Sequence, residues 1–354
     1  MIYFSPGAVA ISTRISRRRL FLLPIIVMLA LSLLPFAGSA QAAASYQPSH
    51  TFAAVKKRAA MPANSWQKST IRSKSQRNWY RVNLKTRGYL YALLGSLPAD
   101  YNLRLYDAKG KQLNVSDRAG TKPESIGRML DAGTYYLLVG SSKGHSKSNY
   151  ELMARVVPRS ATIGVLTQRL ARTSNHAVGE IVNVSDSWLE VVQMDVSLYD
   201  SRGKLLKKYK KQSNHPWIPI APGARVHYSA FVERAPYFER AASVKVVPHW
   251  QEQTVRTRVG LKVSGLKKTT TRVYGGGAWS DVDWSVKVTN TSSRTAHDVN
   301  VFLEGRDKRG VVVDIVDGIW QPNLAPGATK KFVVSHSGRR STPVHYTVRA
   351  YETS

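Results

Sequence analysis

Residues 140–144 read Gly-Ser-Ser-Lys-Gly, which matches the G-x-S-x-G pattern around a nucleophilic serine. That chemistry needs a sharp turn from a strand into a helix, with histidine and acidic partners close to the serine. Here one strand-like run precedes the segment and another follows it. We therefore interpret the segment as a turn between two antiparallel strands and not as the nucleophile of a hydrolase.

Patterns for metal binding and for acid–base chemistry are equally sparse. The nine histidines are scattered, and the absence of cysteine excludes thiol catalysis, thiolate metal sites and disulfides. Asp281 with Asp283, and Asp314 with Asp317, are acid pairs, but nothing in their spacing places them across a substrate cleft as a glycoside hydrolase requires. We expect no enzyme, no cofactor and no metal, and an unrecognised hydrolase is the less favoured alternative.

The tyrosines of the sequence favour ligand binding more than any of the above patterns favours catalysis. Neighbours along a strand point to opposite faces, so one of Tyr135 and Tyr136 is expected at the surface. An exposed tyrosine beside lysine or arginine can stack on a sugar ring or pack on a peptide; the alternative is ordinary cross-strand packing. The tyrosines predicted to contact a ligand are Tyr89, Tyr91, Tyr101, Tyr106, Tyr135 and Tyr136.

Positive charge is in large excess. The chain has 52 lysines and arginines against 22 acidic residues, a formal net charge of +30, and its first acidic residue is Asp100. Such a field attracts polyanions at long range and is weakened by salt; a solubility requirement is the alternative explanation. The residues predicted to contact a polyanion are Lys56, Lys57, Arg58, Lys207, Lys208, Lys210 and Lys211.

The start of the chain resembles an export signal. Basic residues between positions 14 and 19 precede an apolar run from Leu20 to Phe36, and Ala40-Gln41-Ala42 fits cleavage by a signal peptidase. We expect residues 1–42 to be a signal peptide, with an uncleaved membrane anchor as the alternative. The predicted location is outside the cell, free or associated with the cell wall, without a transmembrane segment after cleavage and without a dedicated nucleic-acid partner.

Period-2 patterning dominates the rest of the chain. Residues 43–75 are rich in Ala, Ser, Lys and Gln and are predicted to be a flexible basic linker. From Trp79 onward, short runs alternate apolar and polar residues and break at turns such as Asp107-Ala108-Lys109-Gly110. Residues 76–158 are therefore predicted to form a β-sandwich.

This first β region resembles the bacterial pre-peptidase C-terminal domain. The Leu-Tyr-Asp-x-x-Gly turn at 105–110 and the Ala-Gly-Thr-Tyr-Tyr strand at 132–136 carry the resemblance. It implies a secreted module that accompanies enzymes and adhesins without doing chemistry itself. Calcium, which some relatives bind, is not expected, because residues 75–80 supply none of the carboxylates that a calcium site needs.

The remainder, 160–264 and 267–354, reads as two repeats of one domain. Three blocks recur in the same order: Asn183–Asp186 with Asn290–Ser293, Tyr199–Lys204 with Arg306–Val311, and Ile220–Ala224 with Leu324–Ala328. The repeat is longer than a solenoid unit, which favours two whole domains. Each resembles the FxLYD type of immunoglobulin-like domain of bacterial exported proteins, on Val196–Asp200 in the first copy, whereas the second copy departs from that signature.

The sequence thus predicts an all-β protein of three consecutive β-sandwiches. The predicted function is that of a secreted, non-catalytic binding or scaffold protein that adheres to an anionic cell-wall polymer or extracellular polysaccharide. The alternative is an accessory module that binds one specific carbohydrate or protein.

Overall fold

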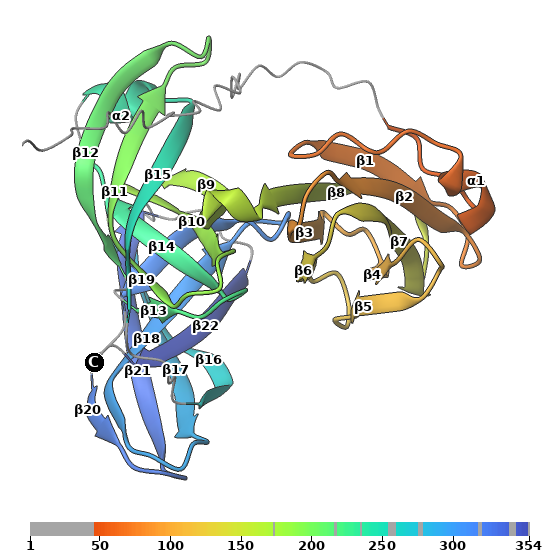
Figure 1. The fold of residues 1–354 in the computed structure, drawn as a ribbon. Helices are drawn as coiled ribbons and strands as arrows, with labels where there is room; N and C mark the ends of the chain where they lie inside the picture. Colours follow the sequence, from red (N-terminus) through yellow and green to blue (C-terminus); the bar gives the residue numbers. More distant parts are fainter. Residues whose placement is uncertain are drawn as a thin grey trace, which may run out of the picture. The chain divides into compact units, whose positions relative to one another are not determined.

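The computed structural model describes residues 46–172, 174–215, 218–233, 236–253, 260–274, 279–317, 321–339 and 345–352. The predicted signal peptide, 1–42, lies outside the described residues. In the described part, strands dominate, and the predicted all-β fold of sandwiches is confirmed (Figure 1). None of the helices in these ranges is long and apolar enough to cross a membrane.

The first sandwich consists of two four-stranded antiparallel sheets. One has the order β1 (Trp66–Ile71), β8 (Ser146–Pro158), β3 (Gly88–Gly95), β6 (Glu124–Leu130). The other has the order β2 (Arg77–Leu84), β7 (Gly133–Lys143), β4 (Asp100–Tyr106), β5 (Gln112–Ser116). Alternate residues of both sheets point inward and form one core, which includes Tyr80, Leu90, Leu103, Leu137 and Leu152.

The prediction of a flexible linker over 43–75 is wrong from Tyr46 onward. Strand β1 pairs with β8, and the short helix α1 (Phe52–Lys56) packs on the first sandwich through its buried Val55. Ser49 forms a β-bridge with Trp79, and Phe52 lies against the same indole with ring centroids 5.1 Å apart. The first sandwich therefore begins well before residue 76. The polar composition of this segment did not reveal its few inward-facing residues.

The second sandwich also has two layers. One layer contains β9 (Ile163–Ala171), β10 (His176–Asn183) and β14 (Arg225–Phe231), and follows a 3-10 turn at Arg159–Ala161. The other contains β11 (Leu189–Tyr199), β12 (Leu205–His215), β13 (Pro219–Ile220) and β15 (Ser243–Glu252), with helix α2 (Pro236–Arg240) before β15. The far end of β12 reaches β14 and joins the two layers at that edge.

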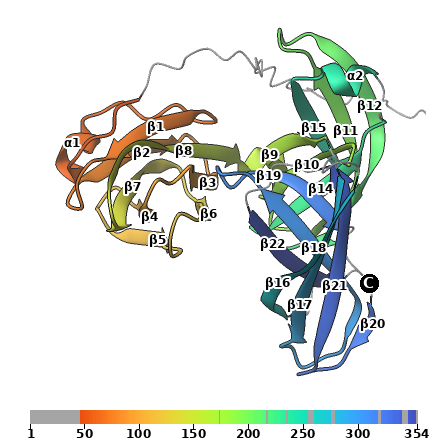
Figure 2. The ribbon, with the colours of Figure 1, turned by 180° about the vertical axis from the view of Figure 1, so that it is seen from behind.

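The third sandwich repeats this plan, as Figure 2 shows from behind. One layer contains β16 (Leu261–Tyr274), β17 (Trp279–Asn290) and β21 (Thr329–Arg339). The other contains β18 (Ala296–Arg306), β19 (Val312–Asp317), β20 (Gln321–Leu324) and β22 (His345–Glu352). Because β16 pairs along β17, the third sandwich starts before the predicted boundary at 267.

The second and third sandwiches share an equivalent set of hydrogen bonds. The amide of Asn183 donates to the carbonyls of Ser187 and Ile220, both at 2.7 Å, and its oxygen accepts from the backbone of Ser185. Asn290 makes the same set of bonds with residues 292, 294 and 324. A buried asparagine therefore ties the turn after its strand to the Ala-Pro-Gly turn in both copies.

An Asp-x-x-Gly turn recurs in all three sandwiches. Asp107, Asp200 and Asp307 each accept two backbone N–H bonds through Oδ1, from the residues two and four positions further on. The closing glycine has a positive φ in every copy, which side chains other than glycine adopt with strain. The same local chemistry thus closes one hairpin in each domain.

The repeated asparagine is predicted to be essential for stability. We expect Asn290→Ala to lower the free energy of unfolding by about 3 kcal/mol, because a buried polar group left without a partner costs about 1–3 kcal/mol. Urea unfolding followed by tryptophan fluorescence measures the change. Asn149→Ala, at an exposed position, is the control and should leave stability unchanged; equal effects of the two substitutions would contradict the assignment.

Candidate functional site

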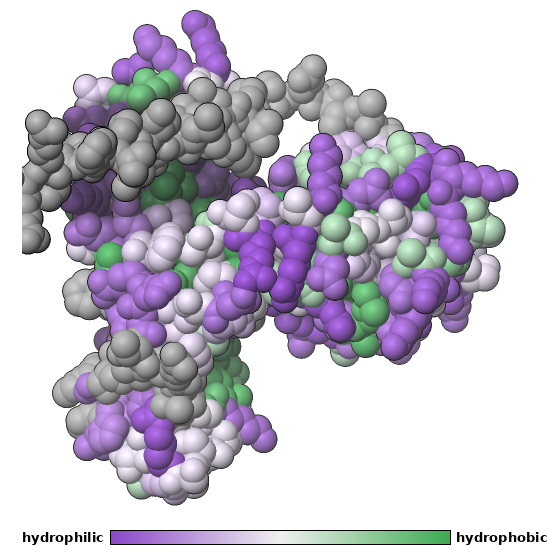
Figure 3. Space-filling view, in the orientation of Figure 1, coloured by the Kyte–Doolittle hydropathy of each residue, from purple (hydrophilic) through white to green (hydrophobic). Residues whose placement is uncertain are grey.

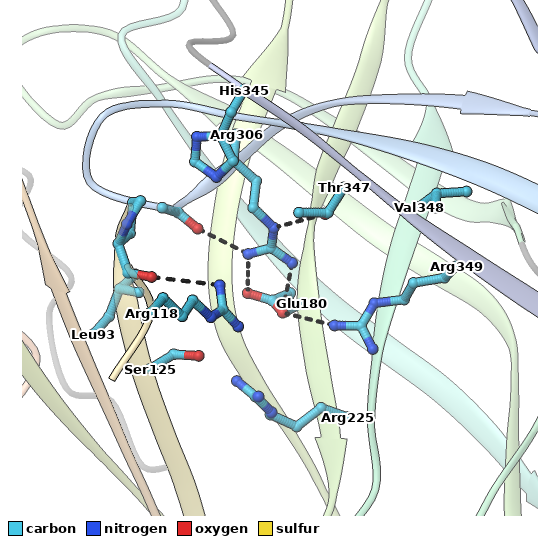
Figure 4. A pocket seen from close by; sticks show the side chains of 12 residues that line it. Leu93, Arg118, Ser125, Glu180, Arg225, Arg306, His345, Thr347, Val348 and Arg349 are labelled. Carbon is cyan, nitrogen blue, oxygen red and sulfur yellow. Dashed lines mark hydrogen bonds and ion pairs between the residues drawn. The ribbon is translucent and has the colours of Figure 1, made fainter. Parts of the chain in front are cut away.

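All three sandwiches contribute to one polar pocket within the compact unit that spans residues 38–354 (Figure 4). The pocket has a volume of about 180 Å³. The residues that line it are Leu93, Arg118, Pro123 and Ser125 from the first sandwich, Glu180 and Arg225 from the second, and Arg306, Gly310, His345, Thr347, Val348 and Arg349 from the third. Four arginines against one glutamate leave the lining with a positive excess.

A buried ion cluster forms the floor of the pocket. Arg306 on β18 donates to both carboxylate oxygens of Glu180 on β10, at 3.1 and 3.2 Å, and to Glu304 at 2.5 Å. Its remaining N–H groups reach the carbonyl of Gly310 at 2.8 Å and the hydroxyl of Thr347 at 3.3 Å. All five N–H directions of the guanidinium are used, and this is the condition under which a buried ion pair is tolerated.

The second glutamate of the cluster is equally well satisfied. Glu304 accepts from the Arg349 guanidinium at 2.6 Å and from the Thr347 hydroxyl at 3.1 Å, and it lies 2.9 Å from His227 Nδ1. Glu180 additionally accepts from the hydroxyl of Tyr91 at 3.2 Å, which brings the first sandwich into the network. The acids are therefore held by hydrogen bonds from several strands and are poorly placed to transfer protons.

The charges in the cluster set each other's ionisation. Burial raises the pKa of Glu304, but the positive charges of Arg306 and Arg349 outweigh it and hold that pKa well below its usual range. The pKa of Glu180 is likewise lowered, because Arg306 and Arg225 outweigh burial. Burial, followed by the charges of Arg306 and Arg118, lowers the pKa of His345. At neutral pH the pocket thus holds ionised acids and arginines beside an uncharged imidazole.

The turn at 307–310 docks the third sandwich on the first. Arg309 forms a bidentate ion pair with Glu151, with both N–O distances 2.8 Å, and the Ser96 N–H donates to the carbonyl of Lys308 at 2.7 Å. A Cβ at Gly95 would lie 2.4 Å from Arg309 Cα, so only glycine permits this approach. The contact fixes the walls of the pocket.

An apolar cluster outside the first core joins the sandwiches next to the pocket. It contains Tyr89, Tyr91 and Leu93 from the outer face of β3, with Met153, Val157, Leu166, Val182, Val184 and Val311. The prediction that Tyr89 and Tyr91 face a ligand is therefore wrong, since the second and third sandwiches cover them. They point away from the first core, as strand alternation requires, but into an inter-domain contact.

Two further tyrosines predicted to bind a ligand are also buried. Tyr101 is fully buried in the first core, with its ring 5.9 Å from that of Tyr150. Tyr136 does point outward, opposite Tyr135, but Phe52 of α1 covers it with ring centroids 4.9 Å apart. The segment that was predicted to be a linker thus occupies the surface on which this tyrosine was expected to be exposed.

Tyr106 and Tyr135 remain half-buried. Tyr106 packs against Trp79 with ring centroids 5.0 Å apart. Tyr135 lines a second pocket, of about 350 Å³, together with Arg87, Asp107, Leu113, Arg128, Met129, Leu130 and Asp131. Of the six predicted tyrosines, Tyr135 is the one placed beside charged groups in a surface pocket.

The residues predicted to contact a polyanion lie at the surface in two groups. Lys56, Lys57 and Arg58 are exposed at the end of α1, where Arg58 donates to the carbonyl of Gln47 at 2.9 Å. Four exposed lysines lie on β12: Lys207, Lys208, Lys210 and Lys211. Lys208 pairs with Asp195 at 3.2 Å, and the other three are the stronger candidates for a ligand.

The Gly140–Gly144 segment forms a strand end and a turn that joins β7 to β8, as predicted, although these strands belong to different sheets. Ser142 accepts from Asn102 at 2.9 Å and donates to Asp117 at 2.6 Å, which is the bonding of a structural hydroxyl. In the described ranges, no three histidine or acidic side chains gather in a way that could hold a metal ion.

Sequence reasoning missed the ion cluster. Its signal was a charged residue inside a buried apolar strand: Glu180 interrupts Val178–Val182, and Glu304 follows Phe302 and Leu303. Residues of this kind are rarely buried unless they are paired. The pattern could have revealed a buried ion pair, but not that Glu180 is bonded by Tyr91 of the first sandwich and Arg306 of the third.

Comparison with known proteins gives matches among solved structures alone: no family model and no curated protein matches the chain. The chain is similar to the pre-peptidase C-terminal domain of a collagenase from Bacillus anthracis, at 16% identity over 26% of this chain and 90% of that one, with a TM-score of 0.23. It is also similar to an exo-chitosanase from Amycolatopsis orientalis, at 9% identity over 78% of this chain and 26% of that one, with a TM-score of 0.21. A β-glucuronidase from Bacteroides uniformis matches at 14% identity over 70% of this chain and 26% of that one, with a TM-score of 0.23. The chain spans about a quarter of the length of these two glycosidases.

The buried cluster is predicted to govern stability and its dependence on pH. Glu304→Gln should lower the free energy of unfolding at pH 7 by about 3 kcal/mol or more, because it leaves buried arginines with an incomplete partner set. A carboxylate whose folded-state pKa is lowered stabilises the protein at pH values above its unfolded pKa, near 4.5, and this contribution is lost as the pH falls through the folded-state value.

Thermal unfolding between pH 7 and pH 3 measures both effects. The wild type should lose stability below about pH 4.5, and Glu304→Gln should show a shallower loss from a lower starting point. Glu233→Gln, at an exposed position, is the control and should follow the wild-type curve. Parallel curves for wild type and Glu304→Gln would show that the cluster does not set the acid response.

Proposed function

We propose that this protein is a secreted, non-catalytic binding protein of the cell envelope that adheres to an anionic wall polymer or extracellular polysaccharide. The observation that carries the proposal is the row of exposed lysines on β12, in a chain with a net charge of +30. Hydrophilic side chains also cover much of the first sandwich in Figure 3. Export rests on the predicted signal peptide.

The local structure of β12 favours presentation of its lysines. The register of β12 against β11 shifts between Met194 and Val196, where Lys211 has a positive φ of 52° and donates its N–H to Asp195 at 3.0 Å. This bulge leaves Lys210 and Lys211 exposed. In the described ranges β12 meets β14 through residues 214 and 215, so the lysines lie on the part of the strand before that contact.

Exposed lysines provide attraction and not a rigid site. Each charge contributes modestly and is screened by salt, so a polymer must engage several at once. This is the behaviour expected of retention on a wall polymer with many phosphates or carboxylates. The motif resemblances at 105–110 and 132–136 to the pre-peptidase C-terminal domain, and of the two repeats to FxLYD-type domains, support a module without chemistry of its own.

The β12 lysines are predicted to dominate wall binding. The triple substitution Lys207→Gln, Lys210→Gln, Lys211→Gln should weaken sedimentation with purified Gram-positive cell walls by about tenfold, given about 0.5 kcal/mol for each lost charge. Binding of the wild type should fall with rising salt and after teichoic acid is stripped from the walls.

A matched variant distinguishes the effect of the position of the lysines on β12 from the effect of the net charge of the protein. Lys109→Gln, Lys111→Gln, Lys143→Gln removes the same charge from exposed positions of the first sandwich and should have a small effect. Equal losses for both triple variants would replace a β12 site by a general charge effect. Wild-type binding that survives both salt and stripping would refute the electrostatic proposal.

One observation favours a specific carbohydrate ligand as the second candidate function. The pocket beside Tyr135 combines an aromatic ring with Arg87, Arg128 and Asp131 in a volume of about 350 Å³. An aromatic face with polar groups at its edge suits a sugar ring. The hydroxyl of Tyr135 donates to the carbonyl of Asp131 at 3.1 Å, which holds the ring in place.

Substitution of this tyrosine distinguishes the second candidate from the first. If the pocket binds a sugar, Tyr135→Ala should abolish binding of soluble, uncharged wall glycan fragments, whereas Tyr135→Phe should retain it because stacking uses the ring. Isothermal titration calorimetry at high salt provides the measurement. Unchanged binding by Tyr135→Ala, or no binding by the wild type, would remove this candidate.

A further inference from the structure

We propose that the pocket at the junction of the three sandwiches binds a single oxyanion, a phosphate or sulfate group, through Arg118 and Arg225. The identity of the anion as a group on a wall polymer rests on the proposed function; the anion site itself rests on the geometry below. Such a site would add selectivity to the non-selective attraction by the β12 lysines.

The arginines of the pocket divide into two pairs. Arg306 and Arg349 are neutralised by Glu180 and Glu304 in the buried cluster. Among the described residues, the side-chain contacts of the other pair are weaker: Arg118 donates to the carbonyl of Pro123 at 3.4 Å, and Arg225 lies 4.9 Å from the centroid of the Tyr91 ring. Arg118 and Arg225 therefore provide the positive charge that is still available to a ligand.

Nearby acids do not cancel this charge. Glu180 attracts Arg225, but its two oxygens already accept from Arg306 and Tyr91. Glu124 attracts Arg118, but its oxygens accept from the Arg118 backbone N–H at 2.6 Å and from the Ser116 hydroxyl. The side chains of Arg118 and Arg225 thus keep N–H groups that these carboxylates do not occupy.

Figure 4 shows where those groups lie. The guanidinium groups of Arg118 and Arg225 and the hydroxyl of Ser125 gather on one side of Glu180, and no interaction joins Arg225 to another residue drawn there. Two planar guanidinium forks with a hydroxyl nearby suit an oxyanion with several acceptor oxygens. A lysine row lacks this directional match.

The size and the burial of the pocket fit one small group. Its volume of about 180 Å³ compares with roughly 30 Å³ for a water molecule in the liquid, so an oxyanion fits together with a few waters. Arg225 is half-buried on β14, where charge interactions are screened less than at the surface, whereas Arg118 is exposed. Through Arg225, the site should retain an anion at salt concentrations that release the β12 lysines.

Calorimetry with defined anions tests the site. The exported protein is titrated with inorganic phosphate, with sulfate and with glycerol phosphate, at constant ionic strength set with chloride. We expect saturable binding of one anion per chain. Preference for glycerol phosphate would indicate a polymer phosphate as the natural ligand, whereas equal binding of inorganic phosphate would indicate a site for the free ion.

Three variants keep the test independent of folding and of wall binding. Arg118→Gln with Arg225→Gln should weaken anion binding by tenfold or more, and Arg225→Lys alone should weaken it less, because it keeps the charge and loses the fork. Lys207→Gln, Lys210→Gln, Lys211→Gln should bind the anion as the wild type does. Thermal unfolding checks that each variant is folded.

His345 supplies an independent readout. It faces Arg306 and Arg118, with Asp307 and Lys122 also acting on its charge. An anion in the pocket would offset the arginine charges, so the pKa of His345 should rise when sulfate, whose charge is constant over this range, is added; nuclear magnetic resonance of the imidazole follows it. Chloride at the same ionic strength should have little effect.

The possible outcomes are distinct. Loss of anion binding in the arginine variants with a sulfate-dependent shift of His345 supports the site. Unchanged binding in the double arginine variant, or no anion binding by the folded wild type, overturns it. Neither of these results alters the wall-sedimentation experiment, so the anion site and the proposed function can fail separately.

Discussion

The arrangement of the second and third sandwiches depends on one guanidinium. Arg306 carries a positive charge into the interior and uses every N–H group it has, on two glutamates, a carbonyl and a hydroxyl. Removing either glutamate would leave buried positive charge only partly compensated, which costs more than the pair itself contributes. The cluster therefore fixes β10, β18 and β22 relative to each other more strictly than apolar packing alone would.

The apolar contacts around this cluster bury side chains between the sandwiches, but they fix the orientation of the sandwiches less strictly. Tyr89, Leu93 and Val311 fill the space between domains, and similar hydrophobic side chains could do so in several registers. The bidentate pair of Arg309 with Glu151 is directional, as is the close approach of Gly95 to the turn. The polar contacts therefore set the direction of the packing.

Much of the fold could be predicted because it is locally encoded. Alternation of apolar and polar residues gave the strands, and the blocks around Asn183 and Asn290 gave the duplication, since each block makes its hydrogen bonds within its own domain. The linker prediction failed because Val55 and Ile71 are isolated apolar residues in a polar segment, and their partners lie elsewhere in the sandwich.

The site was less predictable because, as for the linker segment, its contacts come from distant parts of the chain. The direction of Tyr91 and Tyr136, away from the first core, follows from alternation, but what covers an outward face depends on other segments. Glu180, Arg225 and Arg118 are far apart in the chain and meet only when three domains pack. A site assembled from distant segments has no short sequence motif. The exposed lysines on β12, in contrast, are close together in the sequence and appear there as a run of charge.

The covered outer face of β3 has a consequence for how the protein is made. A chain that emerges N-terminus first completes the strands of its first sandwich at Pro158, before Val182 and long before Val311 are available to cover Tyr89 and Tyr91. During that interval an apolar strip faces solvent, and strips of this kind bind other chains. Synthesis of the last sandwich is therefore part of the folding of the first, and truncated chains would be aggregation-prone even though their own core is complete.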